Sequence, residues 1–121
     1  MKYKKLKIDF KDKRGSISDI FYKKNIQHVA IIKSRPNVRR GDHYHKKTTQ
    51  WMLMTKGSLE YWYKPLKSRA KPKMKLLKVG DLVETMGNSI FLALHLFLRD
   101  VNNLVMSAFT DSGVLAFHFT M

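Results

Sequence analysis

Short runs of strand-forming residues, rather than helical periods, dominate the pattern of apolar and polar positions. No window longer than about ten residues keeps apolar residues at i, i+3, i+4 and i+7 with capping residues at its ends. Apolar and aromatic runs alternate instead with turn-forming residues, at spacings of roughly ten residues. These runs predict strands at His28–Ser34, Gln50–Thr55, Ser58–Tyr63, Met74–Lys78, Ser89–Phe97, Asn103–Phe109 and Val114–Phe119. Such a series of short strands indicates an all-β sandwich or barrel.

Turn residues separate the predicted strands. Lys56-Gly57 predicts a tight turn that joins two strands into a hairpin, and Gly80-Asp81 predicts a second turn. The sequence contains no internal repeat, no low-complexity tract and no obvious linker. We therefore expect residues 1–121 to form a single domain.

The composition limits which cellular compartment and which kinds of metal or disulfide site we expect. The 121-residue chain contains no cysteine, which excludes disulfides and cysteine-ligated metal sites and favours a reducing compartment. Its basic start has no apolar stretch of the kind that signal peptides carry. The longest apolar run, Ile90–Leu98, is too short to span a bilayer. We expect a cytoplasmic protein without a membrane span.

The net charge is the unusual bulk property. Lysine and arginine total 24 against 9 aspartate and glutamate residues, which gives a formal net charge of +15. Such a chain attracts polyanions, although a lysine-biased genome would produce the same excess without any functional meaning. The basic residues are not interleaved with aromatics in an RNA-binding pattern, so we do not expect nucleic acid as a partner. A basic group between Lys64 and Lys78 predicts an exposed hairpin loop, either merely solvated or able to hold phosphate.

Two histidines carry the clearest chemical signal. Successive side chains of a strand point to opposite faces, so His43 and His45 share one face and Tyr44 takes the other. Two neighbouring imidazoles can exchange protons near neutral pH. The same pair could also supply two ligands to a metal ion.

The surrounding spacing resembles the first motif of the cupin family. The pattern G-x-H-x-H-x₄-(Glu/Gln)-x₆-G is filled by Gly41, His43, His45, Gln50 and Gly57. The resemblance implies a double-stranded β-helix, or jelly-roll, barrel. This fold agrees with the series of short strands and, as is common among cupins, implies a homodimer.

A narrower resemblance points to an activity. The segment RRGDHYHKKTTQ and the D-x-R-G opening at residues 12–15 resemble the dTDP-sugar 3,4-ketoisomerases, WxcM-like sugar-nucleotide cupins. These enzymes move a keto group between C4 and C3 of a dTDP-4-keto-6-deoxyhexose, in deoxysugar and surface-polysaccharide biosynthesis. Cupin-type sugar-nucleotide epimerases share a similar opening and paired histidines and remain the alternative activity. A binding module that kept the barrel and lost the chemistry is a third interpretation, supported by the unmatched residues 110–121.

The chain departs from the metal-binding version of the cupin motif. Gln50 stands where metal-binding cupins usually have glutamate, and Phe91 stands where a further histidine is expected. The next candidate, His95, would lie about 13 Å along the strand from that position. Two histidines and a neutral amide make a poor metal site. We therefore expect no metal and no other cofactor, with a metal at His43, His45 and Gln50 as the open alternative.

The resemblance and the chemistry together suggest a role for each site residue. Ketoisomerisation needs groups that titrate near neutrality and a donor facing the developing oxyanion. We expect His43 to act as the base and His45 as its relay or as the acid at the oxygen. The guanidinium of Arg40 suits a diphosphate or a carbonyl oxygen. The expected substrate-binding residues are Arg40, Gln50, Tyr61, Tyr63 and, from the D-x-R-G opening, Arg14.

Overall fold

The computed structural model describes residues 1–35, 43–45, 47–65, 67–86, 89–91 and 103–109. Within 43–45, 89–91 and 103–109 only the backbone is described. This part of the chain forms eleven strands and contains no helix. The strands are β1 (Lys2–Lys5), β2 (Phe10–Asp12), β3 (Gly15–Ile17), β4 (His28–Ser34), β5 (His43–His45), β6 (Gln50–Lys56), β7 (Ser58–Pro65), β8 (Lys73–Lys78), β9 (Asp81–Thr85), β10 (Ser89–Phe91) and β11 (Asn103–Phe109).

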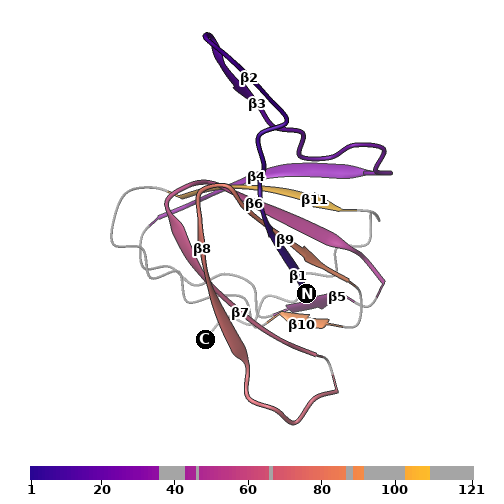
Figure 1. The fold of residues 1–121 in the computed structure, drawn as a ribbon. Coiled ribbons are helices and arrows are strands. Elements are labelled where there is room, and N and C mark those ends of the chain that lie inside the picture. The colour runs from indigo at the N-terminus through magenta and orange to yellow at the C-terminus, as the bar shows by residue number, and fades with distance from the viewer. Residues whose placement is uncertain (36–42, 46, 66, 87–88, 92–102, 110–121) are drawn as a thin grey trace.

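Two antiparallel sheets face each other across the core (Figure 1). The first sheet has the strand order β1-β9-β6-β11-β4, and the second has the order β5-β10-β7-β8. Strands β2 and β3 pair only with each other. This arrangement confirms the all-β prediction. The described residues also include no helix whose length and apolar character would let it span a bilayer.

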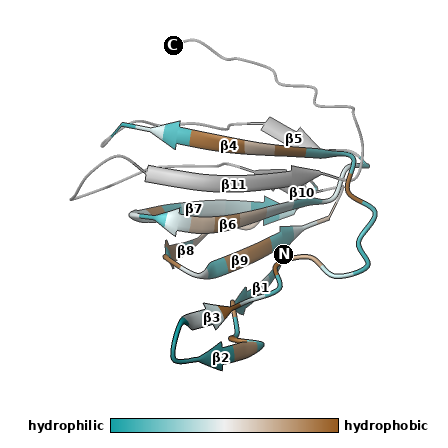
Figure 2. Cartoon of the chain, turned by 90° about the horizontal axis from the view of Figure 1, so that it is seen from above, coloured by the Kyte–Doolittle hydropathy of each residue, from teal (hydrophilic) through white to brown (hydrophobic). Residues whose placement is uncertain are grey.

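A buried cluster fills the space between the sheets. Alternate residues of each strand contribute to it, as expected where one face of a strand is turned inward. Figure 2 shows hydrophobic stretches in the middle of β4 and β9, two strands of the first sheet. The cluster consists of Met52, Met54, Leu59, Tyr61, Leu77 and Val83, with Ile32 and Tyr63 packed against it.

The outer face of the first sheet is also covered. Trp51, Leu53 and Leu82 form a second buried cluster there, on the opposite side of β6 and β9 from the first. Four residues of the N-terminal segment pack on this cluster: Leu6, Ile20, Phe21 and Ile26. Because both faces of β6 are covered, its first five residues, 50–54, are all buried.

The β1 strand is tied to the turn between β8 and β9. It pairs with β9 from Lys2 opposite Glu84 to Lys5 opposite Asp81. The buried carboxylate of Asp81 accepts hydrogen bonds from the Tyr3 hydroxyl and the Lys5 ammonium, both at 3.0 Å, and from the Lys78 amide at 2.8 Å. One carboxylate thus holds the strand and the turn together.

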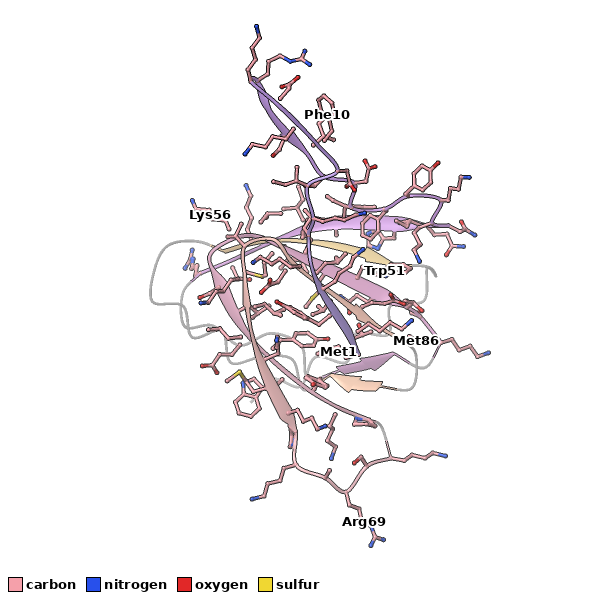
Figure 3. All side chains as sticks on the ribbon, in the orientation of Figure 1. Met1, Phe10, Trp51, Lys56, Arg69 and Met86 are labelled. Atoms are coloured by element: carbon pink, nitrogen blue, oxygen red, sulfur yellow. The ribbon has the colours of Figure 1, made fainter. Side chains whose placement is uncertain are left out.

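The β2–β3 hairpin projects from the outer side of the first sheet, away from the second sheet (Figures 1 and 3). The Arg14 guanidinium binds the Asp12 carboxylate at 2.6 Å across the turn. Three apolar side chains of this region, Ile8, Phe10 and Ile17, are between 53% and 59% exposed. The hairpin therefore has little contact with the rest of its own chain.

Most of the predicted strands are present, whereas β1, β2, β3 and β9 were not predicted. The predicted bounds of β4 and β11 are reproduced, and β6, β7 and β8 differ by one or two residues at one end. Turns occur at Gly57 (φ 80°) and Gly80 (φ 84°), as predicted. The predicted hairpin across Gly57 is wrong, because the chain crosses there from one sheet to the other and β6 and β7 pair with different strands. The basic segment between β7 and β8 is exposed at Lys67, Arg69 and Lys71. The strand expected at 114–119, and the part of 89–97 beyond residue 91, lie outside the described residues.

Candidate functional site

The two histidines of the motif belong to β5, at one edge of the second sheet. Strand β10 connects them to β7, because His45 pairs with Ser89 and Ser89 pairs with Pro65. His43 pairs with Phe91, the residue two positions further along β10. The backbone register therefore sets both histidines in rows that continue across this sheet.

The same register identifies the face of the sheet on which these rows lie. Paired residues share a face, and alternate residues of one strand share it too. Pro65 lies on the same face of β7 as Tyr61 and Tyr63, which belong to or pack on the buried cluster between the sheets. Positions 43 and 45 consequently lie on the face that is turned towards the first sheet. Their side chains, and all of Arg40, lie outside the described part, so their roles remain predictions.

Gln50 lies on the opposite wall of this interior. It is 8% exposed and begins β6, on the same side of the strand as Met52 and Met54. Its backbone carbonyl accepts a hydrogen bond of 3.1 Å from the Thr85 hydroxyl of β9. The N-terminal end of β6 is thereby fixed against its neighbour.

Two tyrosines of β7 line the interior from the second sheet. The rings of Tyr61 and Tyr63 stack with centroids 6.0 Å apart and planes inclined by 27°. Burial raises the pKa of Tyr61 far above its ordinary value, and the opposing effect of a hydrogen bond with Thr85 is smaller. The Tyr61 phenol therefore stays protonated and acts as a hydrogen-bonding group rather than as a base.

Arg14 does not join these residues within one chain. It lies in the turn of the β2–β3 hairpin, and its side chain is 81% exposed. The hairpin points away from the second sheet, which carries the histidine strand (Figure 1). The structure thus brings Gln50, Tyr61 and Tyr63 to one interior and leaves Arg14 outside it.

Thr85 is an interior polar residue that the sequence prediction missed. It is 2% exposed and connects β9 to β6 through the carbonyl of Gln50. The sequence feature that could have revealed Thr85 is its alternate spacing with Asp81 and Val83 along β9. All three residues are buried on one side of the strand. Within 1–35, 47–65 and 67–86, no three histidine, aspartate or glutamate side chains gather in a group that could hold a metal ion.

Solved structures show the same fold. The TDP-quinovose 3,4-ketoisomerase of Campylobacter jejuni is 23% identical, with a TM-score of 0.77 over 95% of this chain and 88% of that one. A 3,4-ketoisomerase of Helicobacter canadensis is 24% identical, with a TM-score of 0.75 over 95% and 87%. The 3,4-ketoisomerase of Thermoanaerobacterium thermosaccharolyticum, a variant in complex with TDP-4-keto-6-deoxyglucose, is 18% identical, with a TM-score of 0.74 over 94% and 82%. The chain therefore has the cupin jelly-roll fold that its sequence predicts.

A comparison at the level of sequence gives the family. No curated protein matches the chain by sequence. The family model described as the polysaccharide biosynthesis C-terminal domain matches residues 10–89, which is more than half of the chain. This stretch includes the D-x-R-G opening, the paired histidines and strands β6 to β9. The chain belongs to the polysaccharide biosynthesis C-terminal domain family.

Proposed function

We propose that this protein is a sugar-nucleotide 3,4-ketoisomerase, which moves the keto group of a dTDP-4-keto-6-deoxyhexose from C4 to C3. The register of β5 carries this proposal, because it sets His43 and His45 on the face turned towards the interior. The shared fold of three 3,4-ketoisomerases supports it, one of them bound to TDP-4-keto-6-deoxyglucose. The family's place in polysaccharide biosynthesis agrees with a deoxysugar product.

The reaction requires proton transfers at two carbon atoms and at two oxygen atoms and involves no net redox change. A base removes the proton from C3, which is acidic because it neighbours the C4 ketone, and the C4 oxygen takes up a proton, so that an enediol forms. A proton then returns to C4 while the C3 hydroxyl loses its own, so the ketone reappears at C3. His43 is the proposed base, and His45 relays the proton or acts as the acid at the oxygen. Both roles suit imidazoles, whose ordinary pKa is close to neutrality.

The remaining interior residues are proposed to bind the substrate and to take no part in the proton transfers. Gln50 offers an amide from the first sheet, while Tyr61 and Tyr63 offer an aromatic wall from the second. Arg40 is proposed to hold the diphosphate or to polarise the carbonyl oxygen. The mechanism uses no metal and no other cofactor. We place the reaction in the cytoplasm, which the cysteine-free sequence favours.

We further propose that the enzyme is a homodimer and that Arg14 binds substrate across the interface. Arg14 lies on a hairpin that projects away from its own interior, so it can contact a bound substrate only in another copy of the chain. The exposed side chains of Ile8, Phe10 and Ile17 support this proposal, because a second copy would cover them. Sedimentation of the wild type and of Phe10→Asp tests the dimer, and a monomeric wild type would contradict it.

Proton incorporation from D₂O tests the activity. The protein is incubated with dTDP-4-keto-6-deoxyglucose in D₂O, and the product is examined by NMR. Deuterium at C4 together with a new 3-ketone is the expected result. Deuterium at C3 or C5 with the ketone unmoved identifies an epimerase instead, and no exchange identifies a binding module.

Histidine variants then test the assignment of roles. His43→Asn and His45→Asn should each lower kcat by about 10²- to 10⁴-fold, which is the usual contribution of a positioned acid or base. His28→Asn is the matched control, because His28 is exposed at the start of β4. Full activity of His43→Asn would refute its role as the base.

A further inference from the structure

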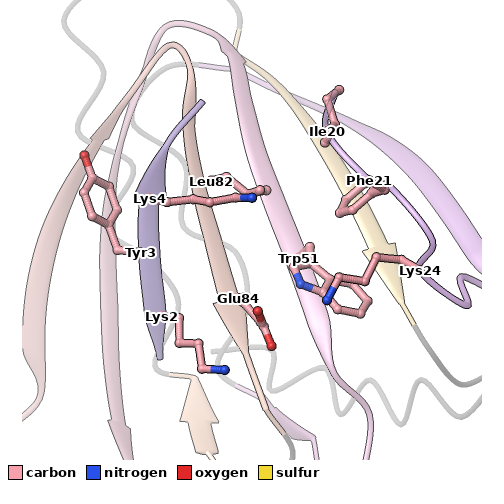
Figure 4. A pocket seen from close by; sticks show the side chains of 9 residues that line it. All are labelled: Lys2, Tyr3, Lys4, Ile20, Phe21, Lys24, Trp51, Leu82 and Glu84. Carbon is pink, nitrogen blue, oxygen red and sulfur yellow. The ribbon is translucent and has the colours of Figure 1, made fainter. Parts of the chain in front are cut away.

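A pocket lies on the outer face of the first sheet, where the proposed reaction has no use for it. It has a volume of about 270 Å³ and is formed by β1, β6, β9 and residues 20–24 (Figure 4). Its lining comprises Lys2, Tyr3, Lys4, Ile20, Phe21, Lys24, Trp51, Leu82 and Glu84. Because successive residues alternate, these β6 and β9 residues point away from the interior that Gln50, Met52 and Val83 face. The pocket and the interior site therefore lie on opposite faces of one sheet.

The floor of the pocket is apolar and aromatic. Trp51 and Leu82 are 6% and 3% exposed, so strand pairing and packing hold both side chains in place. The ring of Phe21 meets the Trp51 ring edge-on, with centroids 5.7 Å apart and planes at 65°. Ile20 completes this surface from the N-terminal segment. A flat apolar group would find a preformed contact surface here.

The rim of the pocket is basic. Lys2 and Lys4 stand on the outer side of β1, and Lys24 holds its ammonium 5.7 Å from the centroid of the Trp51 ring. None of these three lysines forms an ion pair with any described residue. The only carboxylate in the lining is that of Glu84, so the pocket has an excess of two positive charges. Cations gathered above an apolar floor favour an anionic group at the mouth.

We propose that this pocket binds a small aromatic anion, a flat ring that bears a single phosphate or carboxylate group. The ring lies against Trp51, Phe21 and Leu82, and the anionic group faces the lysines. Inorganic phosphate alone would leave the floor empty, and a neutral ring would leave the rim uncompensated. The volume suits a single ring with its substituent rather than a polymer.

Phenyl phosphate serves as the probe, and Trp51 as the reporter. The chain has two tryptophans, so Trp62→Phe leaves Trp51 as the only one. Titration with phenyl phosphate should change Trp51 fluorescence saturably, whereas phenol and inorganic phosphate should each bind at least tenfold more weakly. Equal affinity for phenol and phenyl phosphate would overturn the role of the rim. A fluorescence response that never saturates would overturn the site itself.

Charge variants separate the pocket from the general positive field. In the Trp62→Phe background, Lys24→Met and the double variant Lys2→Met/Lys4→Met remove ammonium groups but keep apolar stems. Each lysine should contribute up to about fivefold in affinity, as expected for a partly solvated charge contact. The control Lys67→Met/Lys71→Met makes the same double charge change in the exposed β7–β8 loop and should leave the affinity unchanged. An equal loss in the control would show that only net charge matters and would overturn the proposal.

Competition with TDP tests the independence of the two sites. Saturating TDP should leave the phenyl phosphate affinity unchanged, because the interior lies on the other side of β6 and β9. Displacement by TDP would overturn the claim of a separate site. Loss of the isomerase activity, by contrast, would leave this measurement unaffected, so the two proposals fail independently.

Discussion

Replacing Asp81 tests how the N-terminal strand is held in the fold. Asp81 is 3% exposed, and its carboxylate accepts hydrogen bonds from the Lys78 amide, the Tyr3 hydroxyl and the Lys5 ammonium. Asp81→Ala removes all three acceptor contacts at once. Asp81→Asn keeps the shape and one acceptor oxygen but loses the charge. The pair of variants therefore separates the hydrogen bonds from the charge.

The magnitude follows from the exposure of each partner. The Lys5 side chain is 60% exposed, so its ion pair with Asp81 is worth at most about 1 kcal/mol. The hydrogen bonds from the Lys78 amide and the Tyr3 hydroxyl end on a charged, buried acceptor and contribute about 1.5 kcal/mol each. We expect Asp81→Ala to lower the free energy of unfolding by about 3 kcal/mol. Asp81→Asn should lower it by about 2 kcal/mol, because one acceptor oxygen survives while one hydrogen bond and the ion pair are lost.

Urea unfolding followed by tryptophan fluorescence measures both losses. Asp19→Asn is the control, because it removes one carboxylate charge at an exposed position and should change stability by less than about 0.5 kcal/mol. If Asp81→Ala cost no more than Asp19→Asn, the carboxylate would not be holding β1 to the β8–β9 turn. An equal cost for the alanine and asparagine variants would show that charge, and not the hydrogen bonds, matters.

The pH dependence supplies an independent check on Asp81. Burial by itself raises the pKa of Asp81, but the hydrogen bonds from Lys78, Lys5 and Tyr3 outweigh it, and the net pKa lies below the ordinary value. A lowered pKa in the folded state means that the carboxylate stabilises the fold above the unfolded value of about 3.9. This contribution is lost as the pH falls through the folded pKa. The stability difference between wild type and Asp81→Asn should therefore shrink below about pH 4.

Three further predictions concern the core and its turn. Gly57 has φ of 80°, so Gly57→Ala should cost about 1 kcal/mol in urea unfolding, and an unchanged midpoint would contradict the strained turn. Leu77 is 0% exposed at the centre of the core, so Leu77→Ala should cost about 3 to 5 kcal/mol, and a loss below about 1 kcal/mol would contradict its burial. The pKa of Tyr61 is raised, so its phenol stays protonated at a pH about one unit above the ordinary tyrosine pKa of about 10. At that pH, Tyr61→Phe should therefore not change the phenolate absorbance of the folded protein.

The sequence predicts those strands whose residues follow a regular pattern or end at strong turns. Strands β6 and β7 meet at the turn at Gly57, and the turn and both strands were predicted, although the two strands pair in different sheets rather than with each other. Strand β4 was predicted from the run HVAIIKS, which alternates between exposed and more buried residues in the structure. In each case the local residues determine the element without help from distant segments.

Two of the strands that were missed, β1 and β9, depend on distant partners. Strand β1 has the sequence KYKK and is exposed throughout, so its strand conformation comes from pairing with β9. Strand β9 is buried on both faces, because the N-terminal segment covers Leu82 while Asp81, Val83 and Thr85 face inward. Polar residues at inward positions obscured the expected alternation.

The candidate site also combines residues that the local sequence pattern reveals with residues whose position only the tertiary fold determines. The motif spacing identified His43 and His45, and alternation along β7 identified Tyr61 and Tyr63 as residues of one face. The position of Arg14 could not be predicted, because its motif does not specify the direction of the hairpin. The basic pocket was also missed, since Lys2, Lys24 and Trp51 are brought together only by the tertiary fold.

The pairing of β1 with β9 also determines how late the N-terminal strand can fold while the chain is being synthesised. The Tyr3 hydroxyl and the Asp81 carboxylate are separated by 78 positions along the chain, yet they hydrogen-bond in the finished fold. A ribosome releases the N-terminal strand long before its partner exists, and contacts between distant segments form slowly. Until residue 85 has emerged, the lysine-rich β1 strand must stay solvated, and its four exposed residues, KYKK, suit that delay.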